Sequence, residues 1–228
     1  MQANALDHVA LWVADRGTLA DFACRHLGMH VIERTDDFTL IGADARRGKL
    51  TLFAAEGPRD RGVLDRVVLR VADLEGALAA LPAALEVARP ESGLVHFDGP
   101  EGLGLGFAAS PAPEVDYDID HVVLRVPQPS VTREGLAELG FERDGDRLTV
   151  GDKAVTLEEG PSGNGERPLL NHIALLVDSG KAQLDEAKRR GIEVAEVRDA
   201  ANTFAVFVWG PDRIKLEYVE HKPTFSLV

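Results

Sequence analysis

The segment IDHVVLRV, at residues 119–126, is apolar and strand-like, yet it carries a histidine near its start. Three closely similar segments occur elsewhere in the chain: LDHVALWV at 6–13, LDRVVLRV at 64–71 and LNHIALLV at 170–177. The third residue is histidine in three of the four copies, and Arg66 in the second. Self-similarity at such intervals indicates a fold assembled from repeated units.

Each copy of the segment alternates between two faces, as a β-strand does. In the third copy His121 shares a face with Arg125, while the opposite face is purely aliphatic. A helical segment follows each copy, most clearly at 17–29 and 180–191. Short strand-like segments complete each unit, which is therefore predicted to be a strand, a helix and three strands. Because the helix must cover one face of the sheet, it packs on the aliphatic face and leaves the histidine facing a concave hollow.

A single unit of this size buries too little apolar surface to be stable, so we expect the units to pair. The segment 111–117 has the composition of a linker and divides the chain at its middle. The prediction is an α+β protein of four tandem βαβββ units in two domains, residues 1–110 and 118–228. Each domain is expected to be an incomplete barrel of mixed sheet with its helices outside.

The composition of the chain limits which molecules the protein is expected to bind. The formal net charge of −13 argues against nucleic acid, because phosphate binding relies on clustered lysine and arginine. No apolar run approaches the ~20 residues that a membrane-spanning helix needs, and the N-terminus lacks a signal pattern. Cys24 is the single cysteine, as suits a reducing compartment. We therefore expect a cytoplasmic protein that binds a small molecule, with a homo-oligomer left open.

The predicted second domain carries a candidate metal site. His121 and His172 occupy equivalent positions in their units, and Glu217 lies within the apolar strand IKLEYV. A buried carboxylate needs a partner, and a metal ion would supply one. Two imidazoles and one carboxylate leave coordination positions open, as in non-haem Fe(II) oxygenases.

The corresponding positions of the predicted first domain are His8, Arg66 and Gly106. Arginine stays protonated and glycine offers no side-chain donor, so this second set cannot hold a cation. We expect an intact site in the C-terminal domain and a degenerate site in the N-terminal domain.

The repeated units, the three candidate ligands and the segment GPDRIKLEY at 210–218 resemble the vicinal oxygen chelate (glyoxalase/bleomycin resistance/dioxygenase) superfamily. More narrowly, the chain resembles type I extradiol ring-cleaving dioxygenases. The resemblance implies an enzyme that cleaves a catechol-like small aromatic compound with dioxygen. It also implies Fe(II) in the C-terminal domain, with Mn(II), Zn(II), Ni(II) or Co(II) as other ions that the same ligands accept.

Members of that family also place histidine and tyrosine side chains near the substrate, and this chain departs from the pattern. The family's tyrosine position falls on Phe207, and its two histidine positions fall near Asn202 and Val155. Asn202 and His221 are then the candidate catalytic residues, and Phe207 and Trp209 the candidate substrate-binding residues. Two alternatives stay open: a divalent-metal isomerase or lyase of glyoxalase type, and a non-catalytic small-molecule-binding protein.

Overall fold

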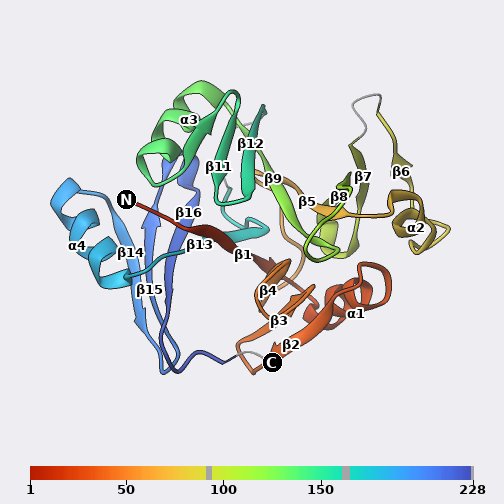
Figure 1. Ribbon diagram of the computed structural model, residues 1–228, viewed down its shortest axis with the longest axis horizontal. Coiled ribbons are helices and arrows are strands. Elements are labelled where there is room, and N and C mark those ends of the chain that lie inside the picture. The colour runs from red at the N-terminus through yellow and green to blue at the C-terminus, as the bar shows by residue number, and fades with distance from the viewer. Residues whose placement is uncertain (91–93, 161–164, 227–228) are drawn as a thin grey trace.

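The computed structural model describes residues 1–90, 94–160 and 165–226. Within these residues, four helices and sixteen strands follow one another in the predicted order of repeated units (Figure 1). The first unit comprises β1 (Ala5–Val13), α1 (Arg16–His26), β2 (His30–Arg34), β3 (Phe38–Gly42) and β4 (Lys49–Ala54). The second comprises β5 (Leu64–Val71), α2 (Leu74–Ala79), β6 (Val87–Ala88), β7 (Val95–Asp98) and β8 (Gly104–Ala109). The third comprises β9 (Asp118–Val126), α3 (Pro129–Glu138), β10 (Glu142–Asp144), β11 (Arg147–Val150) and β12 (Lys153–Glu159). The fourth comprises β13 (Leu170–Leu176), α4 (Gly180–Arg190), β14 (Val194–Asp199), β15 (Thr203–Trp209) and β16 (Lys215–His221).

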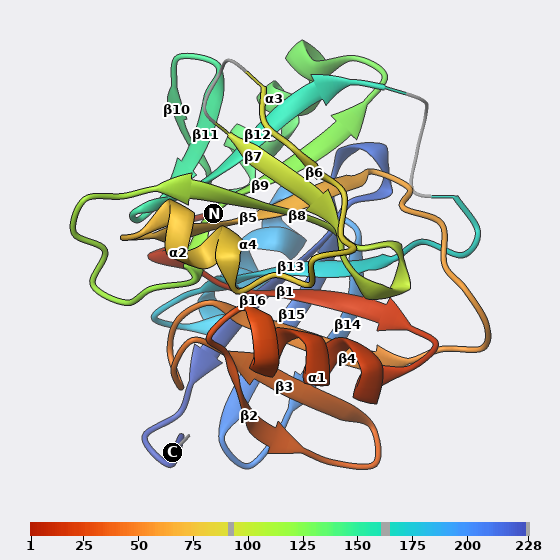
Figure 2. The ribbon, with the colours of Figure 1, turned by 90° about the vertical axis from the view of Figure 1, so that its right-hand side faces the viewer.

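The strands form two eight-stranded mixed sheets. The first sheet has the order β14-β15-β16-β13-β1-β4-β3-β2, and the second β10-β11-β12-β9-β5-β8-β7-β6. At the centre of the first sheet β1 runs antiparallel to β13, and at the centre of the second β5 runs antiparallel to β9 (Figures 1 and 2). The predicted fold class, an α+β arrangement of paired βαβββ units, is confirmed.

The predicted pairing of the units is wrong. The first unit shares its sheet with the fourth, and the second shares its sheet with the third, so residues 1–110 and 118–228 do not form one sheet each. The physical reason lies in the repeated segment itself. Within every unit the segment is the strand at the open edge, and it completes its hydrogen bonds on the matching strand of another unit. Because the four segments are so alike, their sequences do not distinguish one partner from another.

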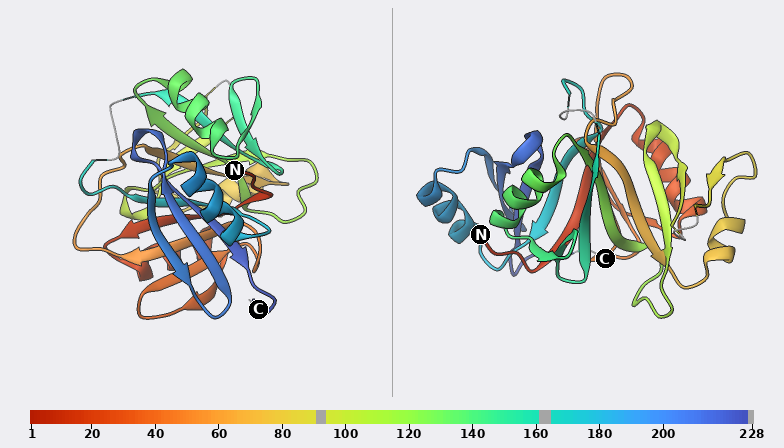
Figure 3. Two further views of the ribbon diagram at one scale, coloured as in Figure 1. Left: turned by 90° about the vertical axis from the view of Figure 1, so that its left-hand side faces the viewer. Right: turned by 90° about the horizontal axis from the view of Figure 1, so that it is seen from above.

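Helices α1 and α3 bridge the two sheets, and their buried apolar residues belong to one contiguous core. Helix α1 contacts β2, β3 and β4 of its own sheet and the 3-10 turn Pro100–Gly102 of the other sheet. Helix α3 does the reverse, contacting its own strands and the 3-10 turn Pro211–Arg213 (Figure 3). This reciprocal packing fixes the two sheets against each other.

Local side-chain and backbone features end the helices. The Asp15 side chain accepts a hydrogen bond from the backbone N–H of Thr18 at the start of α1. Gly191 ends α4 in the left-handed conformation, with φ of 68°. In the described part of the chain, no helix has the length and apolarity that crossing a membrane requires.

Candidate metal centre

Three side chains that could ligate a metal ion converge in the hollow of the first sheet: His8 on β1, His172 on β13 and Glu217 on β16. The Nε2 atoms of the two histidines lie 3.2 Å apart. Glu217 Oε2 lies 2.8 Å from His172 Nε2 and 3.3 Å from His8 Nε2. His172 and Glu217 are buried, and the His8 side chain is 13% exposed. Two imidazole nitrogens and a carboxylate oxygen directed at one point are a donor set that fits a divalent transition metal.

The strand register explains why these residues meet. His172 pairs with Ala10 across the central strand pair, and His8 pairs with Ala174, so the two histidines are diagonal neighbours on one face. Ala174 in turn pairs with Glu217 on the parallel strand β16. Side chains at such neighbouring positions on one face of a sheet point the same way.

The remaining ring nitrogen of each histidine is held by the preceding residue. His8 Nδ1 lies 2.8 Å from Asp7 Oδ2, and His172 Nδ1 lies 3.0 Å from Asn171 Oδ1. A hydrogen bond donated from Nδ1 fixes the ring orientation and leaves Nε2 as the free ligand nitrogen. The arrangement is that of metal-binding histidines in general.

The surroundings of His8 favour its protonated form. Burial alone would lower the pKa of His8, but hydrogen bonds to Asp7 and Glu217 outweigh burial and raise it from 6.5 to about 9. Burial lowers the pKa of His172, so this imidazole is neutral at pH 7. Burial opposes ionisation of Glu217, yet the two imidazoles hold its pKa below its usual range. A metal ion at this site would therefore replace the proton on His8.

Asp7 is also the centre of a buried ion pair. Lys49 Nζ donates to both Asp7 carboxylate oxygens, at 2.9 and 2.8 Å, and Lys49 is 2% exposed. His221 Nε2 lies 3.4 Å from Asp7 Oδ1. These contacts hold the pKa of Asp7 well below its usual range despite its burial, so Asp7 supports His8 as a carboxylate. Lys49 is a functional residue that was not predicted; the signal for it in the sequence is a lysine at the start of the apolar strand KLTLF.

A cavity of about 340 Å³ lies over the three candidate ligands. Its walls come from both units of the first sheet, including the edge strands β2 and β14, so the sheet curls around it as an incomplete barrel should. Phe53 and Phe207 are among its apolar walls, and the ring of Phe207 meets that of His172 edge-on at 5.2 Å. The cavity therefore offers an aromatic surface next to the donor set.

Three of the predicted substrate-side residues line this cavity: Asn202, Phe207 and His221. Burial lowers the pKa of His221, which also stacks on Phe225 at 3.7 Å. Trp209 does not line the cavity; its ring lies under the guanidinium of Arg213, 3.9 Å away. Phe207 and Trp209 are two residues apart on β15 and so lie on the same face of the strand, but only Phe207 lines the cavity.

The prediction that His121 ligates the metal with His172 and Glu217 is wrong. His121 lies on β9 of the second sheet, where its Nδ1 is 2.7 Å from Asp120 Oδ1. Among the described residues, the group with metal-binding geometry contains His8 in its place. The repeat equivalence of the histidines was correct, but the wrong pairing of units selected the wrong partner.

The three residues of the predicted degenerate site, His8, Arg66 and Gly106, are divided between the two sheets. Arg66 and Gly106 do lie in one sheet, the second, where His121 accompanies them instead of His8. In this register His121 pairs with Val68 and Arg66 with Val123, which matches the diagonal relation of the two histidines in the first sheet.

Residues 5–105 match the family described as the Glyoxalase/Bleomycin resistance protein/Dioxygenase superfamily. The match covers the first two units and shows that this part of the chain is similar to that superfamily. The predicted resemblance to the vicinal oxygen chelate superfamily is thus confirmed. The superfamily includes dioxygenases, and a histidine and glutamate group able to hold a metal is present. No curated protein matches the sequence.

Solved structures share the fold over nearly the whole chain. A Bacillus subtilis subsp. subtilis str. 168 protein named as a "putative dioxygenase" has a TM-score of 0.78 at 20% identity, covering 97% of this chain and 86% of that one. A mutant of glyoxalase I from Zea mays has a TM-score of 0.72 at 15% identity, covering 95% and 93%. The cppA protein of Streptococcus pneumoniae TIGR4 has a TM-score of 0.65 at 16% identity, covering 96% and 98%. At these identities the likeness establishes the fold.

Proposed function

We propose that the chain is a metal-dependent dioxygenase of extradiol type, which binds a divalent ion through His8, His172 and Glu217 and cleaves a catechol-like small aromatic substrate. The observation that carries the proposal is the convergence of two Nε2 atoms and one carboxylate oxygen within 4.8 Å of one another. Fe(II) is the ion that this donor set favours for oxygen chemistry, with Mn(II), Zn(II), Ni(II) and Co(II) as competitors.

The number of ligands favours this class over an isomerase or lyase of glyoxalase type. In the first unit, Thr51 occupies the position that Glu217 occupies in the fourth, because it pairs with Ala10 as Glu217 pairs with Ala174. The site therefore has one carboxylate and not two at these related positions. A trio leaves room for both a chelating substrate and dioxygen.

A divalent ion here would lower the pKa of a phenolic hydroxyl and supply the Lewis acidity that the reaction needs. The chain's own residues orient the ligands and shape the cavity. Asp7 and Asn171 orient the two imidazoles. Phe53 and Phe207 give the aromatic ring an apolar wall and exclude water beside His172.

His221 is the candidate general base. Burial lowers its pKa, so its ring is neutral at pH 7 and able to accept a proton from a substrate hydroxyl at the nitrogen that does not face Asp7. Asn202 lines the same cavity and can donate a hydrogen bond from its side-chain amide to a substrate oxygen. These two residues take the place of the histidine and tyrosine that the resemblance implies.

Oxygen consumption tests the proposal. Protein loaded anaerobically with Fe(II) should take up dioxygen when mixed with one or more members of a catechol panel, and His172→Ala should abolish this uptake. His221→Gln should keep the metal content and lower kcat about 100-fold, the scale of general base catalysis. Metal-loaded protein that consumes no dioxygen with any catechol would contradict the proposal, and metal-dependent turnover of an α-oxoaldehyde thiol adduct instead would support the glyoxalase-type alternative.

A further inference from the structure

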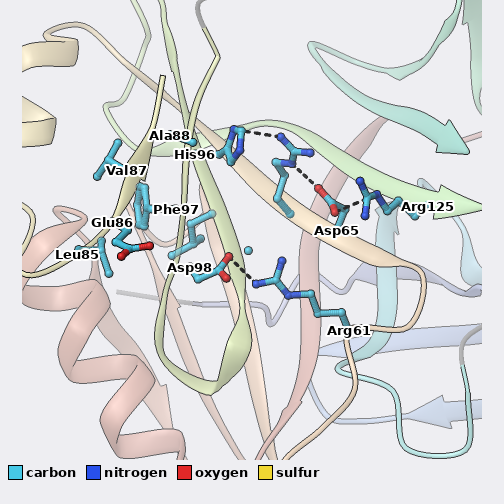
Figure 4. A pocket seen from close by; sticks show the side chains of 13 residues that line it. Arg61, Asp65, Leu85, Glu86, Val87, Ala88, His96, Phe97, Asp98 and Arg125 are labelled. Carbon is cyan, nitrogen blue, oxygen red and sulfur yellow. Dashed lines mark hydrogen bonds and ion pairs between the residues drawn. The ribbon is translucent and has the colours of Figure 1, made fainter. Parts of the chain in front are cut away.

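The second sheet has its own cavity, of about 540 Å³, lined mainly by residues of the second unit and by Arg125 of the third (Figure 4). Arg66 on β5 lines it and stands where the repeat places the histidines His8 and His172. The proposed function makes no use of this cavity. Its size suits a small organic molecule.

The guanidinium of Arg66 has donor capacity to spare. Its Nε is 2.5 Å from Asp65 Oδ2, but Nη1 is 3.4 Å from His96 Nδ1 and Nη2 is 3.5 Å from Glu158 Oε1. Both of the latter contacts are at the limit of hydrogen bonding. The side chain is only 13% exposed, so water compensates little for them. A ligand oxygen could accept from both Nη groups at once.

A second arginine faces the same place. Arg125 Nε lies 3.3 Å from Asp65 Oδ1 and 3.7 Å from Glu158 Oε2, so the two guanidinium groups share the Asp65 carboxylate. Figure 4 shows Asp65 and Arg125 together on one side of the cavity. Both oxygens of Asp65 are thus engaged by arginine. The hydrogen-bonding capacity left at this end belongs to N–H donors, which select an anion.

Glu158 is the acidic group that competes for the two arginines, and its distances of 3.5 Å to Arg66 and 3.7 Å to Arg125 are those of weak contacts that a ligand carboxylate could replace. The remaining carboxylates lie elsewhere. Asp98 pairs with Arg61 at 2.5 Å, and Glu86 is exposed to solvent. Opposite Asp65 and Arg125, Figure 4 shows the side chains of Leu85, Val87 and Phe97. The cavity therefore has two arginines, paired with Asp65 and more weakly with Glu158, at one end, and apolar side chains with the exposed Glu86 at the other.

We propose that this cavity binds a small organic carboxylate with an apolar body, the carboxylate on Arg66 and Arg125 and the body against Leu85, Val87 and Phe97. In this interpretation the second sheet, which lacks a complete set of metal ligands because Arg66 and Gly106 stand at two of the corresponding positions, keeps an anion site beside Arg66. The ligand would bind independently of the metal centre, since the two hollows belong to different sheets.

Calorimetric titration with benzoate tests this proposal, with benzamide as the uncharged probe of the same shape. The metal-loaded wild-type chain should bind benzoate at least about tenfold more tightly than benzamide. Arg66→Gln should weaken benzoate binding at least about tenfold, while Arg46→Gln, at an exposed arginine, should leave it unchanged. Arg125→Gln, at a half-exposed side chain, provides a second variant whose folding is less at risk.

The His172→Ala variant distinguishes benzoate binding in this cavity from benzoate binding at the metal centre. Benzoate affinity retained in that variant supports the second cavity, and affinity lost there would place the benzoate on the metal and overturn the proposal. Undetectable binding to the wild type, equal binding of benzamide, or wild-type affinity in both Arg66→Gln and Arg125→Gln would also overturn it.

Discussion

Asp7→Asn should weaken both the fold and the metal site, and the two effects can be separated. Asp7 and Lys49 form an ion pair at 2.8 Å, with side chains 6% and 3% exposed. Removing one partner of a buried pair leaves the other charge uncompensated, at a cost of about 3–5 kcal/mol in the free energy of unfolding. The asparagine also replaces a carboxylate acceptor of the His8 Nδ1 proton by a weaker amide oxygen. Loss of such support lowers metal affinity about 10- to 100-fold.

Two variants distinguish these effects. Adding Lys49→Met to Asp7→Asn removes the stranded charge, so it should recover most of the stability while the metal affinity stays low. Asp120→Asn makes the equivalent change in the second sheet, where Asp120 holds His121 Nδ1 at 2.7 Å. It should leave metal affinity unchanged, because His121 is not a ligand in this account.

The assay is urea denaturation of the metal-free chains together with Zn(II) titration against a chromogenic chelator. Wild-type metal affinity in Asp7→Asn would refute the supporting role of Asp7. An equal loss of affinity in Asp120→Asn would refute the assignment of the site to the first sheet.

Four further predictions concern the proton on His8, the pH dependence of stability, the core and the pairing of units. Because the pKa of His8 is about 9, Zn(II) binding at pH 7 should release about one proton. Calorimetry in buffers of different ionisation enthalpy should detect the released proton as a binding heat that changes with the buffer. Binding heats that are the same in all buffers would contradict this prediction. The same raised pKa stabilises the metal-free fold fully below pH 6.5, and the stabilisation is lost as the pH rises through 9. Tyr218→Phe removes the hydroxyl that donates to the buried Leu139 carbonyl at 2.6 Å, and urea denaturation should show a loss of about 1–3 kcal/mol with metal content unchanged. Fragments 1–110 and 118–228 should each fail to bind Zn(II) and should regain binding when mixed, because each sheet takes one unit from each fragment; a fragment 118–228 that binds Zn(II) alone would contradict the observed pairing.

The repeated segment was sufficient to predict the βαβββ units and the hollow that the histidines face. Alternation within IDHVVLRV and its copies determines which side of each strand is aliphatic, and this is a local property of the sequence. The choice of partner for each open edge is not local, because it depends on how α1 and α3 pack against the turns of the opposite sheet. The segments themselves are nearly interchangeable, so the sequence could not decide it.

The uncertainty about which units pair also explains why two of the three candidate ligands were predicted correctly and the third was not. His172 and Glu217 belong to one unit, so they share a hollow whichever unit pairs with theirs, and both are correctly placed. Their third companion comes from the partner unit, and either His8 or His121 completes a trio of identical chemistry. Lys49 could not be assigned for a different reason: it belongs to the same unit as Asp7, but its role as the partner of Asp7 depends on the register of β4 beside β1.

The central claim is that the first and fourth units together form the metal centre. The metal stoichiometry of two single variants tests this claim most directly. Wild type and His121→Ala, dialysed against Zn(II) and then against metal-free buffer, should each retain about one ion per chain, and His8→Ala should retain almost none. A His8→Ala chain that keeps its ion while His121→Ala loses it would contradict the account.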